Sequence, residues 1–243
     1  MRSAWARKAG MLLALLILAY APAMALDKLQ DGIYAVNPDK PDELLSLNAE
    51  PDLRVLILEK IKPKTLSEAH SVALREWVES GGVLWVSGDA VETPLLALVS
   101  KGIMFGDFNY KKATTGKQGG ELIVRGASDR LVIYDHPLTV GVDELFIQPV
   151  RKFDGSKDLM PLVEMTDMAG EKGIVLGAIS VKRGYIVLDG TKTPQGMARS
   201  AGDFNRDKPH AVKMADDTWN DYDWGKLMEN AKAVKGSYPP PKT

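Results

Sequence analysis

The sequence predicts an α/β fold with a mostly parallel sheet and a β-hairpin near the C-terminal half. Two segments, Arg54–Glu59 with its apolar run Val55–Leu58 and Val83–Ser87, have the apolar character of strands that are buried on both faces. The segment between them has helical spacing and ends at Gly81-Gly82. This order of strand, helix and strand predicts a βαβ unit, and a right-handed crossover would make the two strands parallel neighbours in one sheet.

The first residues are expected to be an export signal. A basic start is followed by an apolar run from Met11 to Ala21, and Ala23-Met24-Ala25 has the small-x-small pattern that signal peptidase cuts. We therefore expect residues 1–25 to be a signal peptide and the mature protein to be periplasmic or secreted. The alternative is an uncleaved anchor, although the apolar run is shorter than the roughly 18 residues of a spanning helix. No stable membrane span is expected after the signal is removed.

Composition narrows the function classes. With 31 basic and 32 acidic residues the chain has a net charge of −1, so it lacks the basic excess of a nucleic-acid binder. The chain has no cysteine, which excludes disulfides, thiolate metal sites and cysteine nucleophiles. The fold must therefore be stabilised by burial of a core, which a chain of this length can provide.

The elements of the first half follow in order. Residues 26–50 are interpreted as an N-terminal arm in which Asp42–Asn48 could form one or two helical turns. After the first strand, Thr65 and Glu68 fit a capping box and predict a helix start. That helix is expected to pack Trp77 on the sheet and to leave His70 at the surface. A further helix is expected over Pro94–Ser100, after the second strand.

The second half is rich in predicted strands. The candidates are Glu121–Val124, Leu131–Tyr134, Leu145–Phe153, Pro161–Met165, Ile174–Val181 and Tyr185–Leu188. The last two are joined by a tight turn and predict the hairpin. An apolar stripe over Trp219–Val234 predicts a closing helix. We therefore expect one flavodoxin-like, doubly wound domain over residues 51–236, followed by a proline-rich tail at 237–243.

Three segments resemble exported class I glutamine-amidotransferase-like domains, which include the trehalose-utilisation-like proteins. Leu74–Ser87 resembles their helix, glycine pair and following strand, and His136–Val142 resembles their His-Pro-Leu/Ile-Thr-x-Gly segment. Gly177–Asp189 resembles their closing pair of strands. The resemblance spans roughly residues 53–235.

The resemblance fails at the catalytic position. Amidotransferases that hydrolyse glutamine attack it with a cysteine on the turn after a buried strand. Here the comparable turn reads Ser87-Gly88-Asp89-Ala90. A chain without a thiol is not expected to hydrolyse glutamine in this way. Ser87 is a poor substitute, because its neighbours do not form Gly-x-Ser-x-Gly.

Candidate binding residues follow from the expected topology. In an open α/β sheet, ligands bind beyond the carboxyl ends of the parallel strands. Three segments should converge there: Glu59-Lys60, Ser87-Gly88-Asp89 and Asp189-Gly190-Thr191. We therefore predict that Ser87, Gly88 and Asp89 contribute to a ligand site.

Catalytic and metal candidates have competing structural explanations. Asp89, Glu92 and His136 could supply acid–base groups, but capping of a helix start explains the two carboxylates and a backbone hydrogen bond explains the histidine. The side chains of Asp203, Asn205 and Asp207 alternate like the first half of a calcium loop. The loop then departs from that pattern, because lysine and methionine occupy the expected glycine and glutamate positions. No cofactor and no metal are expected.

Two main functions remain open from the sequence. The first is a non-catalytic exported domain that binds a partner protein or a small ligand in the cell envelope. The alternative is a hydrolase or isomerase that acts on a sugar-like metabolite through carboxylate and histidine residues. A structural subunit of an envelope complex is a third possibility.

Overall fold

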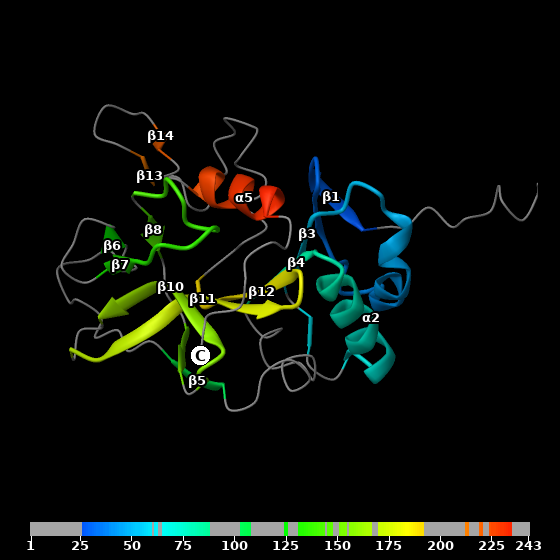
Figure 1. Ribbon diagram of the computed structural model, residues 1–243, viewed down its shortest axis with the longest axis horizontal. Coiled ribbons are helices and arrows are strands. Elements are labelled where there is room, and N and C mark those ends of the chain that lie inside the picture. The colour runs from blue at the N-terminus through cyan, green and yellow to red at the C-terminus, as the bar shows by residue number, and fades with distance from the viewer. Residues whose placement is uncertain are drawn as a thin grey trace, which may run out of the picture.

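The computed structural model describes residues 26–59, 61–62, 65–87, 103–107, 124–125, 131–143, 145–147, 151–154, 156–166, 170–191, 212–213, 219–220 and 224–234. Its centre is a mixed, ten-stranded sheet in which eight strands follow the order β1-β2-β3-β4-β12-β11-β10-β7 (Figure 1). Strands β5 and β9 join this sheet off the main path. The α/β class predicted from the sequence is confirmed.

Four neighbouring strands form the parallel part of the sheet. They are β2 (Ile33–Ala35), β3 (Val55–Leu58), β4 (Val83–Ser87) and β12 (Gly184–Asp189). Every residue of these strands is buried, which explains why the sequence shows apolar runs and not an alternating pattern. The predicted parallel pairing of β3 with β4 is confirmed, with Val55 opposite Val83.

Antiparallel strands extend the sheet on both sides. Strand β1 (Asp27–Gln30) pairs with β2, so the segment interpreted as an arm supplies strands of the main sheet. On the other side lie β11 (Lys172–Val181), β10 (Leu159–Thr166), β7 (Leu131–Ile133), β9 (Arg151–Asp154) and β5 (Met104–Asp107). The predicted hairpin is confirmed as β11–β12, and its turn holds Lys182 at a φ of 51°.

Two short ribbons stand apart from the main sheet. Strand β6 (Val124–Arg125) pairs with β8 (Phe146–Ile147), and β13 (Val212–Lys213) pairs with β14 (Trp219–Asn220). The predicted closing helix is shorter than expected, because Trp219 and Asn220 belong to β14 and the helix α5 covers Trp224–Ala233.

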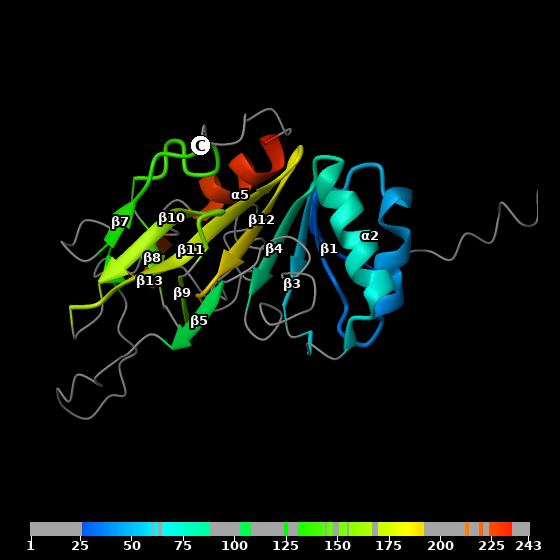
Figure 2. The ribbon, with the colours of Figure 1, turned by 60° about the horizontal axis from the view of Figure 1, so that its bottom comes forward.

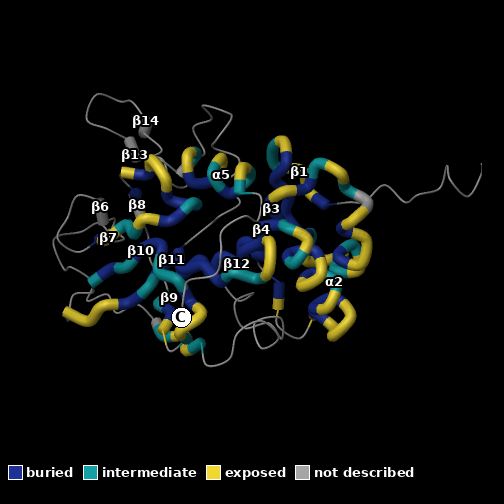
Figure 3. The backbone as a smooth tube through the Cα atoms, in the orientation of Figure 1, coloured by how far each residue is buried: buried dark blue, intermediate teal, exposed yellow. Residues whose placement is uncertain are grey.

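Helices pack on the two faces of the sheet. Helix α2 (Glu68–Glu79) and the 3-10 helix η1 (Pro41–Ala49) lie at the β1 side, and α5 lies over β11 and β12 (Figure 2). Trp77 of α2 belongs to the same buried cluster as Leu56 and Leu84. Met228 of α5 belongs to the cluster on the opposite face, with Trp85. Figure 3 shows the resulting buried band along the strands and the exposed outer sides of the helices.

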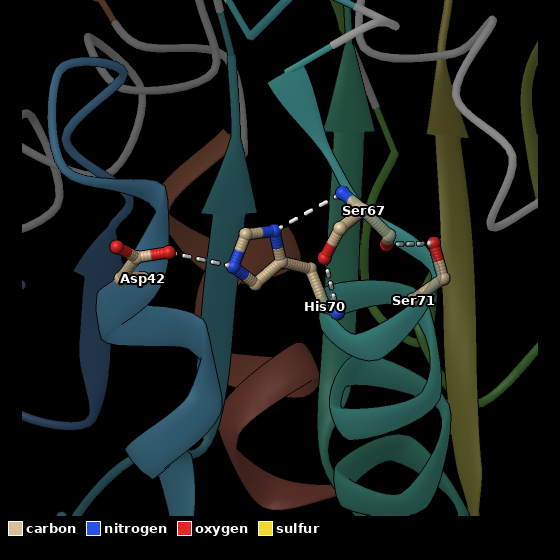
Figure 4. A network of polar contacts seen from close by, with 4 residues as sticks. All are labelled: Asp42, Ser67, His70 and Ser71. Carbon is tan, nitrogen blue, oxygen red and sulfur yellow. Dashed lines mark hydrogen bonds and ion pairs between the residues drawn. The ribbon is translucent and has the colours of Figure 1, made fainter.

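The start of α2 differs from the sequence prediction. The N-cap is Ser67 and not Thr65, and its Oγ accepts a hydrogen bond from the His70 backbone N–H at 3.3 Å (Figure 4). His70 occupies the position expected for Glu68, because its Nδ1 accepts from the Ser67 N–H at 3.1 Å. A histidine thus closes the capping box that usually uses glutamate or glutamine.

His70 is buried, with 5% of its surface exposed, so the expectation of a surface residue is wrong. Helix η1 covers it, and Asp42 of η1 lies 3.1 Å from its Nε2 (Figure 4). Because Nδ1 is an acceptor, Nε2 carries the hydrogen and donates it to the Asp42 carboxylate. The side chain therefore ties η1 to the first turn of α2.

Candidate functional site

Polar residues end three neighbouring parallel strands at the same level of the sheet. Asp189 of β12 is paired with Ser87 of β4. Glu59 follows Leu58, which is paired with Val86, so Glu59 comes level with Ser87 on the other side. All three residues are buried. The predicted convergence of these segments at the carboxyl edge is therefore present in the sheet.

Asp189 is fully buried and its two carboxyl oxygens each accept one hydrogen bond. Oδ2 accepts from the indole Nε1 of Trp85 at 2.8 Å, and Oδ1 accepts from the Thr191 N–H at 2.8 Å. Burial raises the pKa of Asp189 above its ordinary value, and the hydrogen bonds from Thr191 and Trp85 oppose that rise. The group is therefore an unusually basic carboxyl group at the end of the sheet.

Two buried hydroxyl groups lie beside Asp189. Ser87 is 1% exposed and Thr191 is 4% exposed. Among the described residues, neither the Oγ of Ser87 nor the Oγ1 of Thr191 has a partner at hydrogen-bonding distance and angle. The Thr191 side chain is nevertheless close enough to Asp189 to oppose the rise in the pKa of that carboxyl group. Buried hydroxyls are normally bonded, because each unsatisfied one costs roughly 1–3 kcal/mol. These two groups are available to a ligand that reaches the strand ends.

The backbone beside this edge is tightly held. The Gly190 N–H donates to the Val175 carbonyl, and the Gly190 carbonyl accepts from the Arg151 N–H. A Cβ at position 190 would lie 2.2 Å from the Arg151 carbonyl oxygen, so only glycine fits there. These contacts hold the backbone of Gly190 in place, and with it the neighbouring residues Asp189 and Thr191.

His136 lies elsewhere on the sheet. Its ring contacts Tyr185 edge-to-face, with centroids 5.4 Å apart, and Tyr185 is paired with Val83 near the start of β12 and β4. Asp189 is four residues further along β12, about 13 Å at the rise of a strand. The structure therefore does not bring His136 to the edge where Ser87 and Asp189 meet.

The environment of His136 also favours the neutral form of its ring. Nδ1 accepts from the Leu138 N–H at 3.1 Å, which is the backbone bond that the sequence offered as an explanation. Burial lowers the pKa of His136, and this effect outweighs the opposite influence of the neighbouring Asp135 carboxylate.

The other candidates lie outside the described residues. These are Gly88, Asp89, Glu92, Asp203, Asn205 and Asp207, together with the expected helix Pro94–Ser100, the signal segment and the tail. Within the described ranges, histidine and acidic side chains form no group of three that could hold a metal ion. The helices of those ranges are too short or too polar to cross a membrane.

The sequence did not reveal Trp85 as a partner of Asp189. Trp85 and Ser87 are two residues apart on one strand and so point to the same face. The hydrogen bond from Trp85 to Asp189, 104 positions away, depends on which strands are neighbours in the sheet. The available indication was that side chains two residues apart on a strand point to the same face, which places Trp85, Ser87 and Asp189 on one face. This can be inferred only when the register between β4 and β12 is known.

Comparisons with known proteins give distant structural similarities. No protein-family model and no curated protein sequence matches the chain. A β-galactosidase from Bacillus circulans sp. alkalophilus is 10% identical, with a TM-score of 0.46 over 83% of this chain and 28% of that chain. A second, from Rahnella sp. R3, is 10% identical, with a TM-score of 0.42 over 61% of this chain and 21% of that one. This chain thus spans less than a third of either enzyme.

A ThuA-like protein from Bacteroides uniformis ATCC 8492 is also similar in structure. It is 15% identical, with a TM-score of 0.38 over 64% of this chain and 66% of that chain. No residue of this chain takes its role from that similarity.

Proposed function

We propose that this protein is an exported, non-catalytic binding domain that takes a small polar ligand at the carboxyl edge of its parallel strands. The observation that carries the proposal is the pair of buried hydroxyls, on Ser87 and Thr191, which lie beside the buried Asp189 and make no well-formed hydrogen bond to the residues that the structure describes. A ligand with hydroxyl or carbonyl groups would satisfy them and regain the free energy that their burial costs. The proposal includes a flavodoxin-like, doubly wound arrangement, an amidotransferase-like origin without the catalytic cysteine, and a periplasmic or secreted location.

A binding role is favoured over catalysis for two reasons. A serine nucleophile needs a bonded base, and within the described ranges the Ser87 hydroxyl has no hydrogen-bond partner. The alternative, a hydrolase or isomerase for a sugar-like metabolite, requires His136 to work with carboxylates at the strand ends. His136 instead contacts the sheet near the start of β12.

The indole N–H of Trp85 provides a reporter for this site, because it donates directly to Asp189. We would titrate glucose, trehalose and glutamine into the isotope-labelled protein and follow that N–H resonance by NMR. Saturable movement by at least one of these compounds is expected. The double variant Ser87→Ala/Thr191→Val should abolish it, because both free hydroxyls are removed.

Ser46→Ala, on the exposed side of η1, is the matched control and should bind as the wild type does. Movement that persists in the double variant would place the ligand elsewhere. If none of the compounds moves the resonance, but an envelope protein captured in cells protects the same edge from hydrogen exchange, partner binding is the better account.

A further inference from the structure

A cavity lies at the opposite ends of the same strands. Its volume is about 600 Å³, within the range of about 300–1,000 Å³ typical of small-molecule sites. The end of η1, the start of β3, the end of α2 and the turn between β11 and β12 form its walls. It is thus separated from the Ser87–Asp189 edge by the length of the parallel strands.

Two arginines line this cavity without an acidic partner among the described residues. Arg54 precedes β3, and among the described residues its guanidinium donates only to the adjacent Leu53 carbonyl. Arg183 lies in the turn before β12. The acids nearby are already engaged: Glu79 bonds Arg75 and Lys182, and Asp52 bonds Lys28 and Tyr34. The two guanidinium groups therefore remain available to an anion.

The arginines are not needed to cap α2, whose end lies beside them. The backbone N–H groups of Ser80, Gly81 and Gly82 already donate to the last carbonyls of that helix, and the Ser80 hydroxyl donates to the Trp77 carbonyl at 2.7 Å. The partial negative charge of a helix end is thereby satisfied locally.

Part of the remaining wall is apolar. Leu53, Trp77 and Val234 line the cavity, and Trp77 is 6% exposed. Gly82 lies directly against the Trp77 ring, where a Cβ would be only 2.5 Å from the ring atoms. Glu50 also lines the cavity, so two cations and one carboxylate leave one net positive charge.

We propose that this cavity binds a small organic anion with a single carboxylate on an apolar body. Arg54 and Arg183 pair with the carboxylate, as guanidinium groups do in bidentate geometry, and the apolar wall contacts the body. This site is independent of the ligand proposed for the carboxyl edge.

The test is an NMR titration with phenylacetate, followed through the indole N–H of Trp77. Phenylacetamide is the neutral isostere and inorganic phosphate is the anion without an apolar body. Saturable binding of phenylacetate is expected with a Kd of about 10 mM or tighter, as suits a probe of this size. The amide and phosphate should bind at least about tenfold more weakly, because each lacks one half of the recognition.

The double variant Arg54→Gln/Arg183→Gln should lose phenylacetate binding by at least about tenfold, and both substitutions are at exposed positions where folding is seldom disturbed. Arg75→Gln, on α2 but outside the cavity, is the matched control and should bind normally. The Trp85 resonance should stay still. Absence of saturable binding, equal binding of the amide or phosphate, or undiminished binding by a folded double variant would each overturn the proposal.

Discussion

At the scale of single residues, the carboxyl group of Asp189 is fully buried. Its two acceptor bonds come from a tryptophan ring and a backbone amide, both uncharged donors. Uncharged donors compensate a buried negative charge less well than a cation would, which is why burial dominates and raises the pKa.

Asp189 should make stability depend on pH with a defined sign. Its pKa in the folded state is raised above the unfolded value of about 3.9, so the folded state holds a proton that the unfolded state has released. The stabilisation from this residue is therefore fully present at low pH and is lost as pH rises from about 4 through the folded pKa.

The comparison with Asp189→Asn isolates this effect, since asparagine does not titrate. We expect the free energy of unfolding of the wild type, minus that of the variant, to fall with rising pH by up to about 1.4 kcal/mol per unit. Urea unfolding at a series of pH values measures it. A difference that stays constant or increases with pH would contradict the assigned environment.

The N-cap of α2 provides a second prediction at this scale. Ser67→Ala should reduce the free energy of unfolding by about 1 kcal/mol, because the Ser67 hydroxyl bonds the free His70 N–H. Thr65→Ala, the residue that the sequence pattern favoured, should stay within about 0.5 kcal/mol of the wild type. Equal losses at the two positions would show that the helix begins earlier than the structure has it.

At the scale of elements, the sequence identified the strands that are buried on both faces and was weaker elsewhere. The continuous apolar residues of β3 and β4, and the glycine pair between the helix and the second strand, together predicted a strand–helix–strand unit. The helix start was ambiguous because Thr65 and Ser67 are both good caps. The packing of η1 on His70 is a tertiary contact that no local pattern contains.

Helix α2 should depend strongly on Trp77. The ring lies between Gly82 and the sheet, and Trp77→Ala should cost about 3–5 kcal/mol by leaving a cavity. Val72→Ala on the exposed side of the same helix is the control and should cost little. Chemical denaturation of both variants measures the contrast, and a Trp77→Ala loss of under about 1 kcal/mol would refute this packing.

At the scale of the whole molecule, the location of the candidate site could be predicted because it depends only on strand direction. The carboxyl ends of β3, β4 and β12 had to meet once the strands were parallel. The sequence did not show that Asp189 would be the buried acid, since that depends on the Trp85 pairing, nor that His136 would lie near the start of β12. Both depend on which strands are neighbours.

The position of β1 and β2 limits how far the N-terminus can be shortened without loss of the fold. Deleting residues 1–25 should leave the thermal unfolding midpoint unchanged, because the sheet begins at Asp27. Deleting residues 1–36 removes Ile33, Tyr34 and Val36, all buried, at a cost of about 5 kcal/mol or more. Circular dichroism should then show loss of cooperative folding. A mature N-terminus found beyond Gln30 in secreted material would be inconsistent with this sheet.

The absence of cysteine leads to an expectation for the purified protein as well. It should release no ammonia from glutamine at any pH at which it is folded, because that chemistry begins with a thiolate. A coupled ammonia assay, with an active amidotransferase as the positive control, measures this. Activity that disappears in Ser87→Ala would instead show that the strand-end hydroxyl is a nucleophile.

The two strands that pair with β12 lie at very different distances from it along the sequence. The hairpin with β11 closes through a short local turn, whereas the pairing with β4, marked by the bond from Trp85 to Asp189, joins residues 104 positions apart. Closing so long a loop costs conformational entropy, so the local β11–β12 hairpin can form before β12 pairs with β4. During that interval the edge of β12 that will pair with β4 is bare, and a bare strand edge can pair with another chain.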